Sequence, residues 1–307
     1  MRTHEHEGIC YSGYRAGQNP DAGLFPSVDE IAEDLHILAK RWRKIRVYDS
    51  GPHAERVLEA IAREGLDLQV LLGAYVQAEV SNPSCPWGGV HDAATLARNV
   101  EENEAEIARA VALANRYSDI VDSVSAGNEA TVSWTDHLVP VERMIHHVRA
   151  LKAGVSQPVT FCENHVPWMH KLAPLVPELD FISIHSYPVW EYRTIEEALE
   201  VTAADHRRVA ERHPGVPVAI TEAGWTTRSN GRGIEPWNAN PELQARYYAM
   251  LSTWARENQV LTYVFEAFDE DWKGSDDPDE PEKHWGLFTI DRRPKPVMQA
   301  AYPELVE

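Results

Sequence analysis

Short apolar runs alternate with longer amphipathic segments along the chain, and this alternation predicts its secondary structure. The short runs are nearly continuously apolar and are bounded by proline, glycine or polar residues, which is typical of strands buried on both faces. Eight such strands are expected, at residues 8–11, 44–49, 68–75, 120–129, 159–162, 181–185, 218–221 and 260–265.

The segments between these strands carry apolar residues at helical spacing and predict the helices. The start of the first helix is marked by Ser27 and Glu30, which have the spacing of a capping box. Helices are expected at residues 27–40, 53–63, 93–117, 140–151, 195–211, 242–256 and 296–301. Strands and helices therefore alternate throughout the chain.

Eight strands that alternate with helical or loop segments in 307 residues match the size of a (β/α)8 barrel, or TIM barrel. No low-complexity linker or change of composition divides the chain, so residues 1–307 are expected to form a single α/β domain. An open, doubly wound sheet is the alternative. It is disfavoured because no G-x-G-x-x-G fingerprint follows the first strand.

Two of the expected strands end in a glutamate. Glu129 follows Asn128, and Glu222 precedes a Gly-Trp turn. A carboxylate at the end of a buried strand is costly unless it has a use. The two glutamates are 93 residues apart, about 31 for each of three pairs of strand and helix, so they belong to the fourth and seventh strands. Both would reach the same mouth of a barrel, and a retaining glycosidase holds two carboxyls there roughly 5 Å apart.

The other residues expected at this mouth are mostly acidic or aromatic. They complete the set Tyr11, Tyr48, Asp49, Tyr75, Asn128, Glu129, Glu163, His185, Tyr187, Glu222, Trp225, Glu266, Asp269 and Glu270. Eight tryptophans also fall in the expected loops, namely Trp87, Trp134, Trp168, Trp190, Trp225, Trp237, Trp272 and Trp285. Tryptophan suits a ligand with both C–H faces and hydroxyl groups, so at least three of them are expected to contact a sugar.

Charge and cysteine content exclude several classes of partner. The chain has 29 basic and 48 acidic residues, a net charge of −19, which argues against nucleic acid and anionic membrane as partners. Its three cysteines, Cys10, Cys85 and Cys162, have no CxxC spacing and are expected to be free, buried thiols. No metal site and no cofactor is predicted, and a monomer is expected.

The first seven residues are polar and lack the apolar segment of a signal peptide. No run of 18 apolar residues occurs in the chain, so it is expected to be soluble. Its location stays open. If a signal peptide has been removed from the chain, a periplasmic or secreted protein is expected, and otherwise a cytoplasmic one.

Two short motifs, GNE at residues 127–129 and TEAGW at 221–225, resemble those of the large clan of retaining (β/α)8 glycosidases. Four others resemble glycoside hydrolase family 17, the β-1,3-glucanases and related glucanosyltransferases, namely GICY at 8–11, RVYD at 46–49, FEAFDEDWK at 265–273 and WGLF at 285–288. The resemblance extends from residue 8 to about residue 300, and it implies a metal-free retaining enzyme on a (β/α)8 barrel.

By this resemblance Glu129 is the general acid/base and Glu222 the nucleophile. It also implies a set of substrate-binding residues, with Tyr11, Asn128, Tyr187 and Trp225 lining glucose subsites and Glu270, Lys273 and Glu282 beside the catalytic pair. Tyr48, Glu266, Asp269, Trp272 and Trp285 at the expected mouth complete that set.

The chain departs from plant members of the family at three positions. Ala223 and Thr226 replace serine and proline, and His185 stands where asparagine is common. With an extended loop at residues 274–284, these changes indicate the microbial branch and leave the shape of the cleft open.

The expected function is hydrolysis of β-1,3-glucosidic bonds in laminarin-type β-glucans by double displacement. Transfer of a glucanosyl group to a sugar acceptor is the main alternative, since it uses the same covalent intermediate. A non-catalytic glucan-binding protein would have lost a catalytic glutamate, and both are present. Another polysaccharide, such as mannan or cellulose, is a third alternative.

Overall fold

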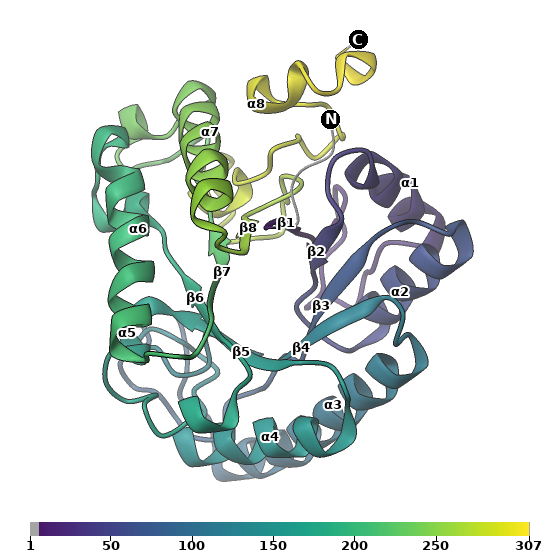
Figure 1. Ribbon diagram of the computed structural model, residues 1–307, viewed down its shortest axis with the longest axis vertical. Helices are drawn as coiled ribbons and strands as arrows, with labels where there is room; N and C mark the ends of the chain where they lie inside the picture. Colours follow the sequence, from purple (N-terminus) through teal and green to yellow (C-terminus); the bar gives the residue numbers. More distant parts are fainter. Residues whose placement is uncertain (1–5, 307) are drawn as a thin grey trace.

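Eight parallel strands form a closed barrel in the order of the sequence, and helices surround it (Figure 1). This computed structural model describes residues 6–306, so residues 1–5 of the polar N-terminal segment lie outside the described residues. The strands are β1 (Glu7–Cys10), β2 (Lys44–Arg46), β3 (Gln69–Gly73), β4 (Val121–Asn128), β5 (Val159–Asn164), β6 (Ile182–His185), β7 (Val218–Ala223) and β8 (Thr262–Val264).

The outer layer consists mainly of α-helices. They are α1 (Val28–Ala39), α2 (Pro52–Glu64), α3 (Ala93–Arg116), α4 (Val141–Gly154), α5 (His165–Trp168), α6 (Ile195–Arg212), α7 (Pro241–Asn258) and α8 (Pro296–Gln299). Five short 3-10 helices lie in the described loops, namely η1 (Val176–Glu178), η2 (Pro188–Glu191), η3 (Pro236–Asn238), η4 (Pro281–Lys283) and η5 (Pro303–Leu305).

The pairing of the first and last strands confirms the expected (β/α)8 barrel. Gly8 of β1 lies opposite Tyr263 of β8, so the sheet closes on itself and is not an open, doubly wound sheet. A Cβ atom at Gly8 would lie 2.5 Å from the Tyr263 ring, so a larger residue there would force the two strands apart.

All eight expected strands and all seven expected helices are present, with ends that differ by a few residues. The capping box at α1 is confirmed, because Ser27 accepts a hydrogen bond from the Glu30 backbone and Glu30 accepts one from the Ser27 backbone. Helix α5 was not expected, since four residues are too few to show a helical period.

Two apolar clusters stabilise the barrel. The larger one fills the space between the strands and the helices. The smaller one consists of the buried strand residues Cys10, Leu71, Cys162 and Tyr263, which pack together as the inside of such a barrel does. The three cysteines are free and buried, as expected. Within residues 6–306, no helix is both long and apolar enough to cross a membrane.

Candidate active site

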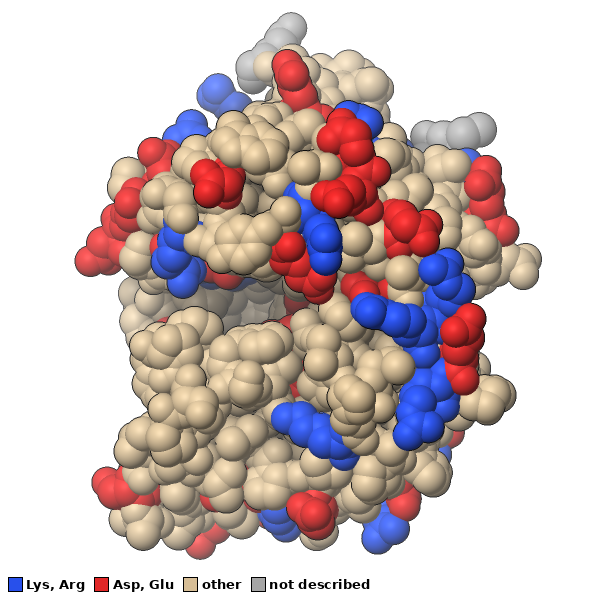
Figure 2. All heavy atoms as spheres, turned by 90° about the vertical axis from the view of Figure 1, so that its left-hand side faces the viewer, with Lys and Arg blue, Asp and Glu red and all other residues tan. Residues whose placement is uncertain are grey.

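A cavity of about 780 Å³ lies at the carboxyl ends of the strands. A hollow is visible at the left-hand edge of the space-filling view (Figure 2). Its lining includes Tyr48, Asn128, Glu129, Tyr187, Glu222, Trp272, Lys273, Glu282 and Trp285 of the residues expected to act in catalysis or substrate binding. These nine residues come from distant parts of the sequence and share one surface because the barrel closes.

The two strand-end glutamates meet in this cavity. Glu129 follows the last residue of β4, and Glu222 lies near the end of β7. One carboxylate oxygen of each lies within 4.8 Å of one from the other. This separation matches the short spacing of retaining glycosidases, whereas inverting enzymes need room for a water between the carboxyls.

Glu222 is held as a carboxylate. Its Oε1 accepts a hydrogen bond of 2.5 Å from Arg46, and its Oε2 accepts one of 2.6 Å from the Tyr187 hydroxyl. Burial would raise the pKa of this carboxyl, but the charges of His185 and Arg46 and the hydrogen bonds from Tyr187 and Arg46 hold the pKa below its usual value. An ionised carboxylate is the form that can act as a nucleophile.

Glu129 has a strained backbone. Its φ of 45° is in the left-handed region, which costs a non-glycine residue roughly 1–2 kcal/mol. A hydrogen bond from its backbone N–H to the Cys162 carbonyl holds this conformation across to β5. The side chain is about a quarter exposed, whereas that of Glu222 is nearly buried. Glu129 is therefore the more accessible of the two carboxyls.

His185 connects the two carboxylates from β6. Its Nδ1 lies 2.9 Å from Glu129 Oε1 and 3.4 Å from Glu222 Oε2. The imidazole is fully buried, which opposes its charge, but Glu222, Cys162 and Glu129 raise its pKa to about 10. His185 is accordingly a cation at neutral pH, and its Nδ1–H donates toward the carboxylates.

His185 also forms a hydrogen bond with Cys162. Burial would raise the pKa of the Cys162 thiol, but the charge of Arg46 and the bond with His185 lower the pKa to about 7. Arg46 also lies 3.4 Å from His185 Nε2. That is a contact between two donors, because the same Arg46 nitrogen donates to Glu222 and to the Thr221 carbonyl.

Two residues expected to line glucose subsites point away from the cavity. The hydroxyl of Tyr11 donates to Asp34 of α1 at 3.2 Å, and its side chain is fully buried. The indole of Trp225 donates to the Asn238 carbonyl at 2.7 Å and packs against Tyr247. The structure therefore places both side chains in the layer that supports the site, because each polar tip finds its partner outside the barrel mouth.

Three expected binding residues form ion pairs behind the cavity wall. Glu266 lies 2.6 Å from the Lys273 amine, and Glu270 lies 3.2 Å from it. Asp269 pairs with Lys295 at 2.7 Å. The three carboxylates do not line the cavity, while Lys273 does, so Lys273 links this buried acidic cluster to the site.

Of the other residues expected at the mouth, Tyr75 and Asp49 line the cavity, and Glu163 does not. Glu163 is fully buried, and its carboxylate accepts hydrogen bonds from the backbone and hydroxyl of Thr131. Burial and the charge of Glu129 raise the pKa of Glu163 to about 7.

The loop tryptophans divide into three groups. Trp190, Trp272 and Trp285 line the cavity, Trp168 and Trp225 are buried, and Trp87, Trp134 and Trp237 are exposed. The aromatic wall is continuous around Trp285, whose ring centre lies 5.2 Å from that of Tyr187 and 6.1 Å from that of Trp190.

Sequence reasoning gave no role to Arg46, although it organises the site. Its guanidinium donates to Glu222 and Asn128 and lies 4.4 Å from the centre of the Tyr48 ring. The sequence did contain a signal for this role, because Arg46 is a charged residue inside a strand predicted to be buried. Because Asn128 Oδ1 accepts this hydrogen bond, the N–H donors of the Asn128 amide remain for a ligand.

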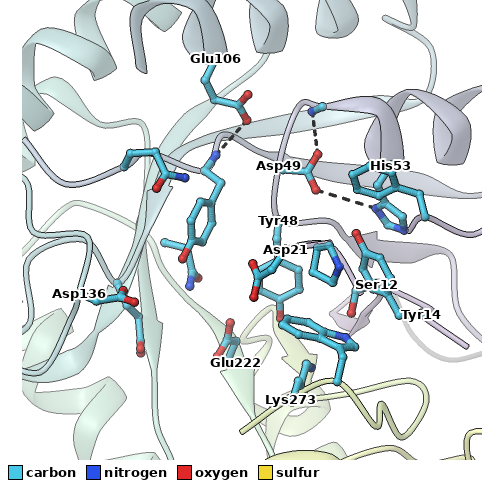
Figure 3. Close-up of a pocket in the computed structure, with 18 of the residues that line it drawn as sticks. Ser12, Tyr14, Asp21, Tyr48, Asp49, His53, Glu106, Asp136, Glu222 and Lys273 are labelled. Atoms are coloured by element: carbon cyan, nitrogen blue, oxygen red, sulfur yellow. Dashed lines mark hydrogen bonds and ion pairs between the residues drawn. The ribbon is translucent and has the colours of Figure 1, made fainter. Parts of the chain in front are cut away.

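A second group without an assigned role lies at the far end of the cavity. His53 at the start of α2 stacks on Tyr14, with ring centres 5.2 Å apart, and Asp49 lies beside it (Figure 3). Both His53 and Tyr48 line the cavity, and His53 Nε2 is a buried atom with no hydrogen-bond partner among the described residues. A buried polar atom of this kind normally has a partner.

Glu106 of α3 fixes the loops above the cavity. Its Oε1 accepts hydrogen bonds from the backbone N–H groups of Ser50 at 2.7 Å and Tyr75 at 3.0 Å. Figure 3 shows the Glu106 carboxylate at the edge of the cavity with a dashed line to a hydrogen-bond donor. The loops after β2 and β3 are thereby tied to one helix, which sets the position of the Tyr75 ring at the cavity.

Glu129, His185 and Glu222 are also close enough to share a metal ion. The Arg46 guanidinium, however, already contacts Glu222, and His185 is itself cationic, so a metal ion there would meet two positive charges. Glu104, His146 and His147 form another such group, and His165, Glu191 and Asp205 a third, both outside the cavity lining.

Known proteins share this fold and part of this sequence. The chain matches the model of the BtgE/BtgC glycoside hydrolase domain over residues 8–286. It is 31% identical over 299 residues to a glucan 1,3-beta-glucosidase from Arthroderma benhamiae, with 92% of this chain and 88% of that protein covered.

Two solved structures are similar to the whole barrel. An endo-laminarinase from Formosa Hel1_33_131 has a TM-score of 0.84 and 26% identity, with 97% of this chain and 87% of that chain covered. An active-site mutant of a β-1,3-glucanosyltransferase from Rhizomucor miehei, in complex with laminaritriose, has a TM-score of 0.73 and 21% identity, with 95% and 96% covered. The latter similarity concerns the fold alone.

Proposed function

This chain belongs to the BtgE/BtgC glycoside hydrolase domain family, and we propose that it is a retaining enzyme that cleaves β-1,3-glucosidic bonds in laminarin-type glucans. The observation that carries the proposal is the close approach of Glu129 and Glu222, whose oxygens come within 4.8 Å. The names of its relatives, a glucan 1,3-beta-glucosidase and an endo-laminarinase, support the substrate. We also assign the chain to glycoside hydrolase family 17 on its sequence motifs.

In the first step, a carboxylate oxygen of Glu222 bonds to the anomeric carbon, and the bond from that carbon to the leaving oxygen breaks. Glu129 gives its proton to the leaving oxygen, so the leaving sugar departs as a neutral alcohol. Arg46 and Tyr187 hold the attacking carboxylate in place from two sides.

In the second step, water attacks the anomeric carbon from the side that the leaving sugar has vacated. Glu129, now ionised, takes a proton from this water, and the bond between Glu222 and the sugar breaks. His185 donates its Nδ1–H to Glu129 at 2.9 Å, which stabilises the carboxylate between the two steps. Two inversions at one carbon give net retention.

The lining of the cavity favours a neutral sugar chain. Eight acidic side chains line it, against the two basic residues Arg109 and Lys273. An anionic glycan would be repelled, whereas a glucan can place its hydroxyls on the carboxylates and its C–H faces on the aromatic wall. All of these groups come from one chain, so we expect the enzyme to act as a monomer.

Transfer to a sugar acceptor is the second candidate, and one feature favours it. The leaving sugar, and hence any acceptor, must lie on the side of Glu129. On that side Tyr75 contributes a partly exposed ring to the cavity, with its centre 4.9 Å from that of His137. An aromatic surface there can retain a sugar where water would otherwise attack.

Substitution of Glu222 by glutamine tests the proposal. It should lower kcat on laminarin by about 10⁴-fold or more, because the amide is not a nucleophile, and leave the affinity for laminari-oligosaccharides within a few fold. Glu235→Gln changes an exposed carboxylate in the loop after β7 that does not line the cavity, and it should behave as the unmodified protein. Full activity of Glu222→Gln would exclude the assignment.

A further inference from the structure

Two loops above the acid/base side of the cavity are joined into one rigid unit. One is residues 74–92, between β3 and α3, and the other is residues 129–140, between β4 and α4. The Asn82 side chain donates to the carbonyls of Ser133 at 2.9 Å and Thr135 at 2.7 Å. Asn82 is itself buried, so these bonds are protected from water.

A second set of contacts joins the same loops through residues 89–91 and Asp136. The His91 ring lies 3.0 Å from the Asp136 carbonyl. A Cβ atom at Gly89 would lie 3.4 Å from the Asp136 Cα and 2.9 Å from the Cys85 Cβ, so the backbones are in close contact. Because Gly89 also has a φ of 91°, a larger residue there would both strain the loop and separate it from its neighbour.

This unit exposes two tryptophans that the cavity does not use. Trp87, beside the glycine pair, is 59% exposed, and Trp134 is 39% exposed. Val90 is 70% exposed on the same unit. Large aromatic side chains are normally withdrawn from water, so their exposure on clamped loops next to an active site calls for a ligand.

The unit is continuous with the acid/base side of the cavity. Asp136, two residues beyond Trp134, lines the cavity, and Figure 3 shows it across the cavity from Tyr14 and His53. The His137 ring lies 2.9 Å from the carbonyl of Asn128, the residue before Glu129. The path from the acid/base glutamate therefore leads over Tyr75 and His137 to the exposed tryptophans.

We propose that Trp87 and Trp134 form a platform that binds the leaving-group side of a long β-glucan chain beyond the cavity. The inference rests on the proposed function, since that function defines which side of the cavity holds the leaving sugar. Each indole offers a flat apolar face to the C–H face of a glucosyl unit, and its N–H reaches a hydroxyl. The clamped loops hold the rings in place, so little side-chain entropy is lost on binding.

The area of the platform favours a sugar chain over a protein partner. A tryptophan exposes at most about 250 Å², so the two partly exposed rings present on the order of 200 Å². A stable protein interface needs about 800 Å² from each partner. Two rings can, however, hold two glucosyl units of a chain whose other units occupy the cavity.

The test compares a long and a short substrate. In Trp87→Ala/Trp134→Ala, kcat/KM on polymeric laminarin should fall about tenfold, mainly through KM, while kcat/KM on laminaritriose stays within twofold. Each single variant should lose about threefold on the polymer. The control is Trp237→Ala, because Trp237 is 65% exposed on η3 in a different loop. It should match the unmodified protein on both substrates.

Three outcomes would overturn the platform. They are an unchanged polymer KM in the double variant, an equal loss on laminaritriose, and the same loss in Trp237→Ala. Sedimentation of the unmodified protein and of the double variant provides a further check. A dimer that becomes a monomer in the double variant would mean that a second copy of the chain, and not a glucan, covers the two tryptophans. A failure of the proposed function is distinguishable, because the unmodified protein would then cleave neither substrate.

Discussion

Replacing His185 by asparagine removes a buried positive charge between the two carboxylates while keeping an N–H donor near Glu129. His185 Nδ1 lies 3.4 Å from Glu222 Oε2, which corresponds to roughly 5 kcal/mol of attraction at an effective dielectric constant of about 20. Arg46 remains beside Glu222 in the variant, and water can enter the vacated space. We therefore expect a smaller change, a rise of about 1–2 units in the pKa of Glu222, within the range of measured neighbour effects.

The assay is kcat/KM on laminari-oligosaccharides from pH 4 to pH 9. Turnover needs ionised Glu222, so the acidic limb of the profile should move to higher pH by about 1–2 units when the cation is lost. His165→Asn is the matched control, because His165 contacts the His185 carbonyl at 3.2 Å without touching either glutamate. A lower kcat with an unmoved acidic limb in His185→Asn would show that His185 serves packing alone, and thermal melting of both variants would reveal any loss of fold.

Three further predictions follow from the cavity and its walls. Carboxymethylated β-1,3-glucan should be cleaved with a kcat/KM at least about tenfold below that of the neutral polymer, and 0.5 M salt should narrow the gap, because the lining is acidic; equal rates at low salt would contradict this. Lys273→Met leaves Glu266 buried without its cation, so urea unfolding should show a loss of about 3–5 kcal/mol, and an unchanged midpoint would contradict the ion pair. Gly224→Ala places a Cβ atom 2.1 Å from the Phe265 carbonyl oxygen, so it should cost about 1–3 kcal/mol by the same assay and lower kcat by displacing the end of β7; unchanged kcat would show that the strands adjust freely.

The fold was predictable because each strand of a parallel barrel is a short apolar run closed by a turn. The run at residues 218–221 is followed by a turn at Gly224, and β7 is found there with Glu222 near its end. The position of strand-end glutamates was predictable for the same reason, since parallel strands all point the same way. Only the barrel geometry was needed to bring Glu129 and Glu222 together.

The direction of each side chain at the mouth was harder to predict. Tyr11 and Trp225 both follow a strand, but their polar tips find partners outside the barrel. Tyr11 donates to Asp34 of α1, and Trp225 donates to the carbonyl of Asn238 in η3. Neighbouring strand residues point to opposite faces, so a shift of one residue at a strand end moves a side chain out of the cavity. Sequence spacing cannot settle such a shift.

The role of Arg46 was hidden for a related reason. Its partners Glu222 and Asn128 lie 176 and 82 residues away, so no local pattern reports them. A positive charge inside an apolar strand indicates a buried partner, but it does not say which carboxylate. The contact became evident only when β2, β4 and β7 faced one another inside the closed barrel.

The stereochemistry of the first product tests the paired action of Glu129 and Glu222 most directly. Proton NMR recorded within minutes of mixing enzyme and laminari-oligosaccharide distinguishes the two anomers of the new reducing end before they equilibrate. Carboxyl oxygens within 4.8 Å predict double displacement, so the β-anomer should appear first and the α-anomer later by mutarotation. Initial formation of the α-anomer would mean direct attack by water and would contradict the assignment of Glu222 as nucleophile.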